Sequence, residues 1–321
     1  MTLKNIFFVV SIVLVLFSCA SDPLDVNPKD KDMGIRYLNL DSLMVHSEAE
    51  VLPDILSKQN LQKEEVLDYV LGHCWFVGKL TDTGTIGRIK LFQKDPFISR
   101  LEKRIQEKYE VINRKKQQID KGFLYLNHHF PKHKVPKNIL FINSFFASNV
   151  FCTENEIGVG VERYLGPETD VIKELPSQQF FQWIKDEMKM EYLERDVLTS
   201  WIMTHFVTES KENLADAMLR WGKVLYLTEA SFPNEEKSLI LRYTPKEFTW
   251  AKENEFSLWK YLVNEKLLFS KDERQHANFL NDAPFTIGLP EKGPDRLGQY
   301  LGWKMVHAYM DKNPKTTLPE L

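Results

Sequence analysis

The sequence predicts an α+β fold that is mostly helical, with a small antiparallel sheet of about three strands. Apolar residues recur every three or four positions through most of the chain, which is the period of amphipathic helices. Around residues 137–161 the pattern changes to short apolar runs and alternating residues, which are typical of strands. With 43% apolar and 12% aromatic residues, the chain can bury a substantial core and is not a disordered stalk.

The first 18 residues have the layout of a secretory signal peptide. Lys4 precedes an apolar run over residues 6–17, which is too short to span a bilayer comfortably. The run ends in a lipobox, Leu16 to Cys19, in which the cysteine is acylated and becomes the first residue of the mature chain. We therefore predict lipidation of Cys19, and the alternative is an uncleaved anchor in which Cys19 is an ordinary cysteine.

The rest of the chain divides into a linker and one domain. Residues 19–35 are polar and contain two prolines, so we expect them to link the lipid to the body, which is a single domain over residues 36–321. The net charge of −3 argues against non-specific nucleic-acid binding, which needs concentrated positive charge. We expect a protein of the cell envelope, anchored to the outer membrane by lipid and facing the periplasm.

Two helices are expected before the strands, at about 63–75 and 96–120. The second begins with Asp95 as a side-chain acceptor and Pro96 at the first helical position, which is a typical helix start. The three strands are expected at 137–146, 150–153 and 157–161.

The C-terminal half is expected to return to helices, at about 177–190, 192–208, 210–228, 245–268 and 294–312. Two helix starts carry capping boxes, in which a hydroxyl and a carboxylate three residues later satisfy opposite backbone amides. These are Thr244 with Glu247 and Ser270 with Glu273. Gly298 and Gly302 are four residues apart on one helix face, and we expect another element to pack closely against them.

Several polar residues fall where apolar ones are expected and are candidates for a buried polar or ligand-facing site. On apolar helix faces or at a helix end these are Glu229, Glu255, His205 and His307. If they converged they could hold a metal ion, whereas the alternative is a satisfied core histidine and a salt-bridged glutamate. The expected partners of Glu255 are Arg163, Arg242 and Arg296, and Arg296 joins the candidate set.

No sequence motif establishes a catalytic or cofactor site. The nearest approach to a zinc-peptidase helix is His129 and His133, but the glutamate base is missing and Pro131 breaks the helix between them. No cofactor and no metal ligand are therefore predicted. Cys74 and Cys152 fit either one disulfide or two inert buried thiols.

Four segments resemble one known family, and the likeness covers nearly the whole mature chain. They are residues 157–166, 244–268, 282–286 and 296–310, the last containing Gly-Gln-Tyr-Leu-Gly-Trp. These segments resemble the gliding-motility lipoproteins of the GldB type, from Bacteroidota. The resemblance implies a lipoprotein that the gliding and type IX secretion machinery needs.

The same layout is similar to a broader set of predicted zinc-peptidase-like proteins, so the resemblance also implies a zincin-like arrangement. In those proteins a helix bearing His-Glu-x-x-His follows a strand that resembles residues 157–161. Here the helix near that place reads Leu-Glu-Arg-Asp-Val-Leu-Thr over residues 193–199, and no pair of zinc ligands stands there. We expect a degenerate member that kept the scaffold, and no catalytic residue is carried over.

The leading hypothesis is a membrane-anchored, non-catalytic lipoprotein that supports motility or secretion through protein partners. One alternative is a metal-dependent hydrolase with a non-standard site that includes Glu229 and Glu255. Another is a glycan- or peptidoglycan-binding module that uses the tryptophans of the C-terminal half, since tryptophan is enriched at binding hot spots.

Overall fold

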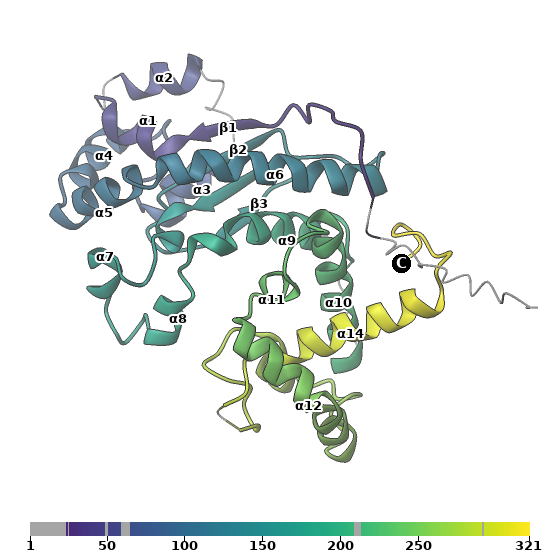
Figure 1. Cartoon of the computed structure of the whole chain (residues 1–321). Coiled ribbons are helices and arrows are strands. Elements are labelled where there is room, and N and C mark those ends of the chain that lie inside the picture. The colour runs from purple at the N-terminus through teal and green to yellow at the C-terminus, as the bar shows by residue number, and fades with distance from the viewer. Residues whose placement is uncertain (1–23, 25, 49–50, 59–64, 209–212, 291) are drawn as a thin grey trace, which may run out of the picture.

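The computed structural model describes residues 24, 26–48, 51–58, 65–208, 213–290 and 292–321. Helices surround one four-stranded sheet, and a further group of helices lies beneath the sheet in the view of Figure 1. The mostly helical α+β class is therefore confirmed. The predicted signal peptide, Cys19 and the first part of the predicted linker lie outside the described residues.

The sheet is mostly parallel and has the strand order β1-β2-β4-β3. Its strands are β1 (Arg36–Asn39), β2 (Asn138–Ile142), β3 (Val150–Cys152) and β4 (Glu156–Gly160). β1, β2 and β4 run parallel, with Ile139 opposite Ile157, whereas β3 runs antiparallel to β4, with Phe151 opposite Gly158.

The prediction of a three-stranded antiparallel sheet is therefore wrong in two respects. Every residue of β2 is buried, and a continuous apolar run of this kind is typical of a parallel strand with both faces covered. β1 was not predicted because it has four residues of mixed character, and its partner β2 lies far along the chain.

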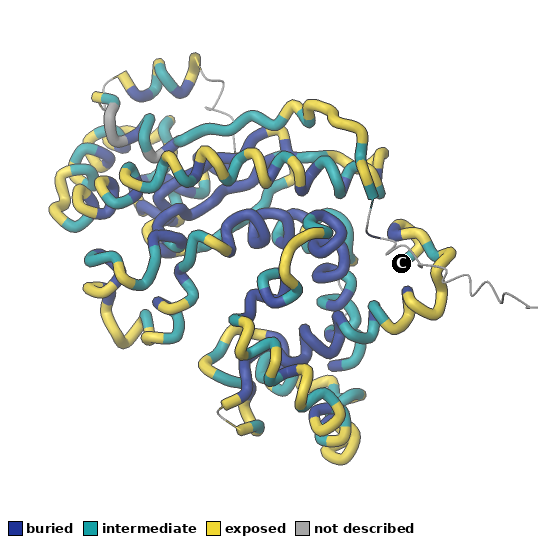
Figure 2. The backbone as a smooth tube through the Cα atoms, in the orientation of Figure 1, coloured by how far each residue is buried: buried dark blue, intermediate teal, exposed yellow. Residues whose placement is uncertain are grey.

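Side chains of β2 alternate between two hydrophobic cores. Leu140 and Ile142 pack with the helices of the N-terminal part, and Ile139 and Phe141 pack with α6 (Tyr109–His129) and α9 (Leu193–His205). The first group of helices comprises α1 (Leu40–His46), α2 (Leu52–Lys58), α3 (Glu65–Tyr69), the π-helix η1 (Val70–Cys74) and α4 (Thr85–Gln93). The sheet is thus covered on both faces, and its two central strands, β2 and β4, are buried and dark blue in Figure 2.

The predicted helix over residues 96–120 is two helices, α5 (Pro96–Gln106) and α6, which are separated at residues 107–108. Its start is as expected, because the Asp95 carboxylate accepts from the Phe97 and Ile98 amides at 2.8 and 3.0 Å. The helix expected at 177–190 is reduced to the short α8 (Gln182–Asp186), which has no side-chain cap. The other elements between β4 and α9 are η2 (Val161–Tyr164), α7 (Asp170–Lys173) and η3 (Met190–Tyr192).

The C-terminal helices form a third core away from the sheet. They are α10 (Leu214–Ser231), α11 (Lys237–Ile240), α12 (Pro245–Asn264), α13 (Glu273–Leu280) and α14 (Leu297–Lys312). The capping box of Thr244 and Glu247 is confirmed at α12. The predicted box at Ser270 is wrong, because Asp272 caps α13 and accepts from the Arg274 amide at 2.9 Å.

Candidate functional site

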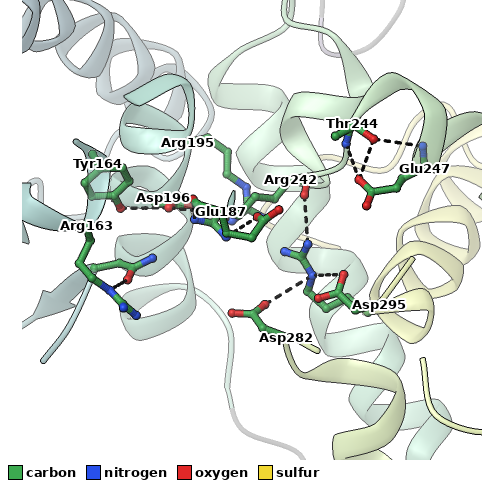
Figure 3. Close-up of polar contacts among 12 residues, drawn as sticks. Arg163, Tyr164, Glu187, Arg195, Asp196, Arg242, Thr244, Glu247, Asp282 and Asp295 are labelled. Carbon is green, nitrogen blue, oxygen red and sulfur yellow. Dashed lines mark hydrogen bonds and ion pairs between the residues drawn. The ribbon is translucent and has the colours of Figure 1, made fainter. Parts of the chain in front are cut away.

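A cavity of about 200 Å³ lies between α9, the edge strand β3 and the start of α14. Three arginines line it, Arg195, Arg242 and Arg296, and each of them is at most 7% exposed. Figure 3 shows the polar cluster around this cavity, in which side chains from η2 and α9 meet side chains from the segments that follow α8 and connect the C-terminal helices. Burying three guanidinium groups together is costly unless each has a partner, so their contacts decide what the cavity can do.

Asp196 is the central acceptor of the cluster. Its carboxylate accepts from Tyr164 Oη at 3.0 Å and from Arg195 Nη1 at 3.0 Å, and it lies 3.3 Å from Arg242 Nε. Arg242 also donates to the Glu187 side chain at 2.8 Å and to the Glu187 backbone oxygen at 3.0 Å. Asp196 and Arg242 therefore join η2, α9 and the turn before α12 through one network.

Arg296, a residue of the predicted site, closes the other side of the cavity. Its Nε donates to Asp295 at 2.9 Å and lies 3.4 Å from Asp282, and its Nη2 donates to the Arg242 backbone oxygen at 3.0 Å. Its guanidinium carbon lies 5.6 Å from the centre of the Tyr243 ring, within cation–π range. These contacts hold Arg296 beside the N-terminal end of α14.

The charges of the cluster oppose the cost of burial. Burial lowers the pKa of Arg195 and is only partly opposed by the Asp196 carboxylate. For Arg242, burial also lowers the pKa, but Asp196 and Glu187 outweigh this effect and the pKa is raised overall. Burial raises the pKa of Glu187, and the arginines oppose that rise. All three arginines remain cationic at neutral pH, because the reference pKa of arginine is above 12.

Two of the predicted site residues, Glu229 and His307, do meet, although away from this cavity. Glu229 is fully buried near the end of α10 and accepts from His307 Nε2 at 2.8 Å and from Trp303 Nε1 at 2.7 Å. Lys237 of α11 lies 2.5 Å from its other oxygen. Burial raises the pKa of Glu229, but His307 and Lys237 outweigh this effect and the pKa is lowered overall.

The remaining predicted residues lie elsewhere, so the four residues of the metal hypothesis do not share one site. Glu255 accepts from Tyr300 Oη at 3.0 Å and lies 3.4 Å from Lys304, rather than pairing with any of the three arginines expected. The His205 ring lies tilted against the Trp201 ring, with 3.8 Å between the ring centroids, and its Nε2 is hydrogen-bonded to the Thr153 backbone oxygen at 3.1 Å. Within the described part of the chain, no group of three or more His, Cys, Asp or Glu residues is placed to hold a metal ion.

Sequence reasoning missed Arg195 and Asp196, although α9 contains a signal for them. Its first turn carries three consecutive charged residues, Glu194 to Asp196, on a helix that is otherwise mostly apolar. Consecutive residues are spaced about 100° around a helix, so three of them cannot share one solvent-exposed face. At least one must turn inward, and all three are buried here.

A second, larger cavity of about 880 Å³ is lined mainly by apolar residues, of which the aromatic ones lie mostly in the N-terminal half of the chain. Phe76, Phe145 and Phe146 line it and have φ of 55°, 53° and 63°, a backbone region that residues other than glycine rarely adopt. Phe76 is 80% exposed. Phe145 and Phe146 follow the carboxyl end of β2, the edge at which parallel sheets commonly bind ligands.

These features define a class of protein: a helix-rich α+β fold on a small, mostly parallel sheet, with an ion-paired arginine cluster beside its antiparallel edge strand. Residues 22–321 match the model of a family described as gliding motility protein GldB. The chain therefore belongs to the GldB family of gliding motility lipoproteins. No curated protein and no solved structure matches it. Among the described residues, none of the helices has both the length and the apolar character needed to span a bilayer.

Proposed function

We propose that this chain is a lipid-anchored, non-catalytic lipoprotein that supports gliding or type IX secretion by binding protein partners. Membership of the GldB family supports a role in gliding. The signal peptide and lipobox over residues 1–19 support acylation of Cys19, with fatty acyl chains such as palmitate as the anchor. The proposed position is the outer membrane, with the body facing the periplasm.

The observation that carries the non-catalytic part is the pairing of two buried carboxylates, Asp196 of the arginine cluster and Glu229 of the predicted site. Asp196 is held by a tyrosine and two arginines, and Glu229 is held by a tryptophan, a histidine and a lysine. A general base needs a free lone pair and a pKa near the working pH. The lowered pKa of Glu229 makes it a poor proton acceptor, and both paired carboxylates suit a rigid binding surface better than proton transfer.

The two cavities also suit contact with another protein. The arginine-lined cavity offers charged recognition, and the aromatic cavity exposes Phe76 and Phe145 to solvent. Clustered apolar side chains that are exposed to solvent commonly mark sites of interaction with other proteins.

Lipid anchoring is tested by Cys19→Ala in gliding cells, with Cys152→Ala as the matched control. We expect Cys19→Ala to leave the membrane fraction, to lose labelling by a palmitate analogue and to impair gliding. The Cys152→Ala variant should remain anchored and labelled. Firm retention of the Cys19→Ala variant in membranes would contradict the proposal.

Partner binding is tested by a photo-crosslinking amino acid at Ser200, which lines the arginine cavity, against the same amino acid at Ser257 on the exposed face of α12. We expect a discrete protein adduct at position 200 that is absent at position 257. Turnover of peptide or glycan substrates by the purified full chain would contradict the non-catalytic part.

A further inference from the structure

We infer that the amino-terminal edge of the parallel sheet, with the basic segment 128–137 at its centre, lies against an anionic bilayer surface. This inference rests on the proposed lipid anchor and adds the orientation of the body on the membrane. It joins two observations, the short length of chain between Cys19 and the buried Leu24, and the basic character of the segment that precedes β2.

The chain before Leu24 leaves little distance between the body and the proposed lipid. Leu24 is 1% exposed and belongs to the core that contains α6 and α9. Cys19 precedes Leu24 by five residues, and a chain of this length spans at most about 18 Å in any conformation. Acyl chains on Cys19 would lie in the hydrocarbon core, below a headgroup layer about 5–8 Å thick. Leu24 therefore lies within roughly 13 Å of the bilayer surface.

The amino-terminal ends of the three parallel strands meet at one edge of the sheet. Arg36 at the start of β1 is paired with Asn138 of β2, which is paired with Glu156 of β4. The Arg36 amide also donates to the Lys137 backbone oxygen at 2.9 Å. The chain that enters β1 therefore lies beside the segment that enters β2. In Figure 1 the first described residues and the right-hand end of α6 lie at the same end of the molecule.

The segment 128–137 at this edge is basic. It contains three lysines and three histidines and no acidic residue. Lys134 is paired with Glu154 at 2.8 Å, and both side chains are exposed. Lys132 and Lys137 are also exposed, and within the described residues neither of them makes an ion pair. These two lysines are therefore available to the phosphate groups of lipid headgroups.

The other charged residues at this end of the molecule are more evenly mixed. Glu156 is only 2% exposed and accepts from the Asn138 side chain at 2.7 Å, so it does not face a bilayer. Residues 29–32 are two lysines and two aspartates, and residues 311–321 carry two lysines against two acidic side chains and the terminal carboxylate. Positive charge is thus concentrated in segment 128–137. Because salt screens charges beyond about 8 Å, this local concentration decides which face meets the headgroups.

The opposite edge of the sheet carries the aromatic cavity. Phe145 and Phe146 follow the carboxyl end of β2, and the helices α4 and α5 that complete the cavity lie at the far left of Figure 1. The described chain begins at the right of that view. Contact of the amino-terminal edge with the bilayer therefore directs the aromatic cavity away from the membrane, where a partner protein can reach it.

The test uses acylated full chain added to vesicles of phosphatidylethanolamine and phosphatidylglycerol whose headgroups carry a nitroxide quencher. A fluorophore is attached at Pro131→Cys or, as the matched control, at Leu91→Cys, which is 71% exposed beside the aromatic cavity. The pKa values of Cys74 and Cys152 are raised to about 12, so the reagent labels the introduced cysteine. We expect loss of most of the fluorescence at position 131 and little loss at position 91. Equal quenching at both positions, or stronger quenching at position 91, overturns the inference.

Charge reversal tests whether segment 128–137 makes the contact. Lys132→Glu combined with Lys137→Glu should lower the quenching at position 131 toward the level at position 91, because attraction to the headgroups becomes repulsion. Lys94→Glu combined with Lys103→Glu is the matched control, since both lysines are exposed and lie near the opposite edge of the sheet. This control should be quenched at position 131 as the wild type is. Unchanged quenching in the first variant overturns the inference.

A photo-crosslinking amino acid at position 131 in gliding cells distinguishes a bilayer from a protein as the occupant of this face. We expect no discrete protein adduct there, in contrast to position 200, and a discrete adduct overturns the inference. Labelling by a palmitate analogue is measured on every variant. An unquenched position 131 on a chain that carries the analogue contradicts the inference alone, whereas a chain without the analogue contradicts the proposed anchor itself.

Discussion

Arg296 donates a hydrogen bond from Nη2 to the backbone oxygen of Arg242 at 3.0 Å, and both residues have a left-handed backbone, with φ of 51° and 57°. A left-handed conformation costs a residue other than glycine roughly 1–2 kcal/mol. The side-chain contacts of both arginines must offset this cost. The cavity is therefore shaped by backbone strain as well as by charge, which is common at functional sites.

Replacing Arg242 by lysine should destabilise the fold by about 2 kcal/mol, because lysine cannot serve Asp196 and Glu187 at once and leaves buried acceptors unpaired. Urea unfolding of the full chain in detergent measures the difference. Arg114→Lys is the control, since Arg114 pairs with Glu110 at 2.9 Å with 67% of its side chain exposed, and it should change stability by less than about 0.5 kcal/mol. Equal effects of the two variants would contradict this prediction.

The sequence predicts those features that a few neighbouring residues determine. Asp95 and Thr244 cap their helices as expected, because a cap depends on residues within one turn. The pairing of β1 with β2 and the meeting of Arg195 with Arg242 were not predicted. Each joins residues far apart in the chain, and only the packing of several helices sets their distance.

In the candidate site, too, the sequence indicates single residues but not the contacts between distant ones. Glu229 and His307 were identified as polar residues out of place, and both are satisfied by partners. Periodicity could not indicate that they pair with each other, since their distance depends on how α10 crosses α14. That crossing in turn depends on Gly222 and Gly302, of which the sequence pattern indicated only the second.

Gly302→Ala should destabilise the fold by about 2 kcal/mol, since its Cβ would overlap the backbone of Met218 on α10. Gly298→Leu should also destabilise, because a Cβ at this position already meets the Phe279 backbone oxygen at 2.9 Å. Thermal melting measures both effects. Gly87→Ala on the exposed face of α4 is the matched control, with no atom within 4 Å of its Cβ, and it should be neutral or stabilising by up to about 1 kcal/mol. A Gly302→Ala melting curve like that of the control would refute the prediction.

Glu229→Gln should lower stability at pH 7 by about 2 kcal/mol, because it leaves His307 and Lys237 without their carboxylate. The pKa of Glu229 is lower in the folded chain than in the unfolded chain. Its ionised form therefore stabilises the fold above the unfolded pKa of about 4.3, and this contribution is lost as the pH falls through the folded pKa.

The difference in the free energy of unfolding between the wild type and Glu229→Gln should therefore be fully present at pH 7 and become smaller at acidic pH. Urea unfolding at a series of pH values measures it. Glu110→Gln removes an exposed carboxylate with 85% of its side chain accessible, so it should change stability little at any pH. A Glu229→Gln effect that does not change with pH would show that packing rather than charge causes it.

The number of reactive thiols among the three cysteines tests the proposed lipid anchor. Cys74 and Cys152 are free, so of the two alternatives drawn from the sequence the pair of thiols holds and the disulfide does not. Burial raises the pKa of both thiols to about 12. Only about one molecule in ten thousand carries a given thiolate at pH 8, so a disulfide reagent should react very slowly with the native chain.

In denaturant both of these thiols should react at once, and the total number of reactive thiols shows whether Cys19 is modified. Chain purified from membranes should yield two thiols, because acylation through a thioether removes the third. Chain made in the cytoplasm, where export and lipidation are bypassed, should yield three and serves as the control. Three reactive thiols in the membrane-derived chain would mean that Cys19 is unmodified, and the body would then need a different attachment to the bilayer.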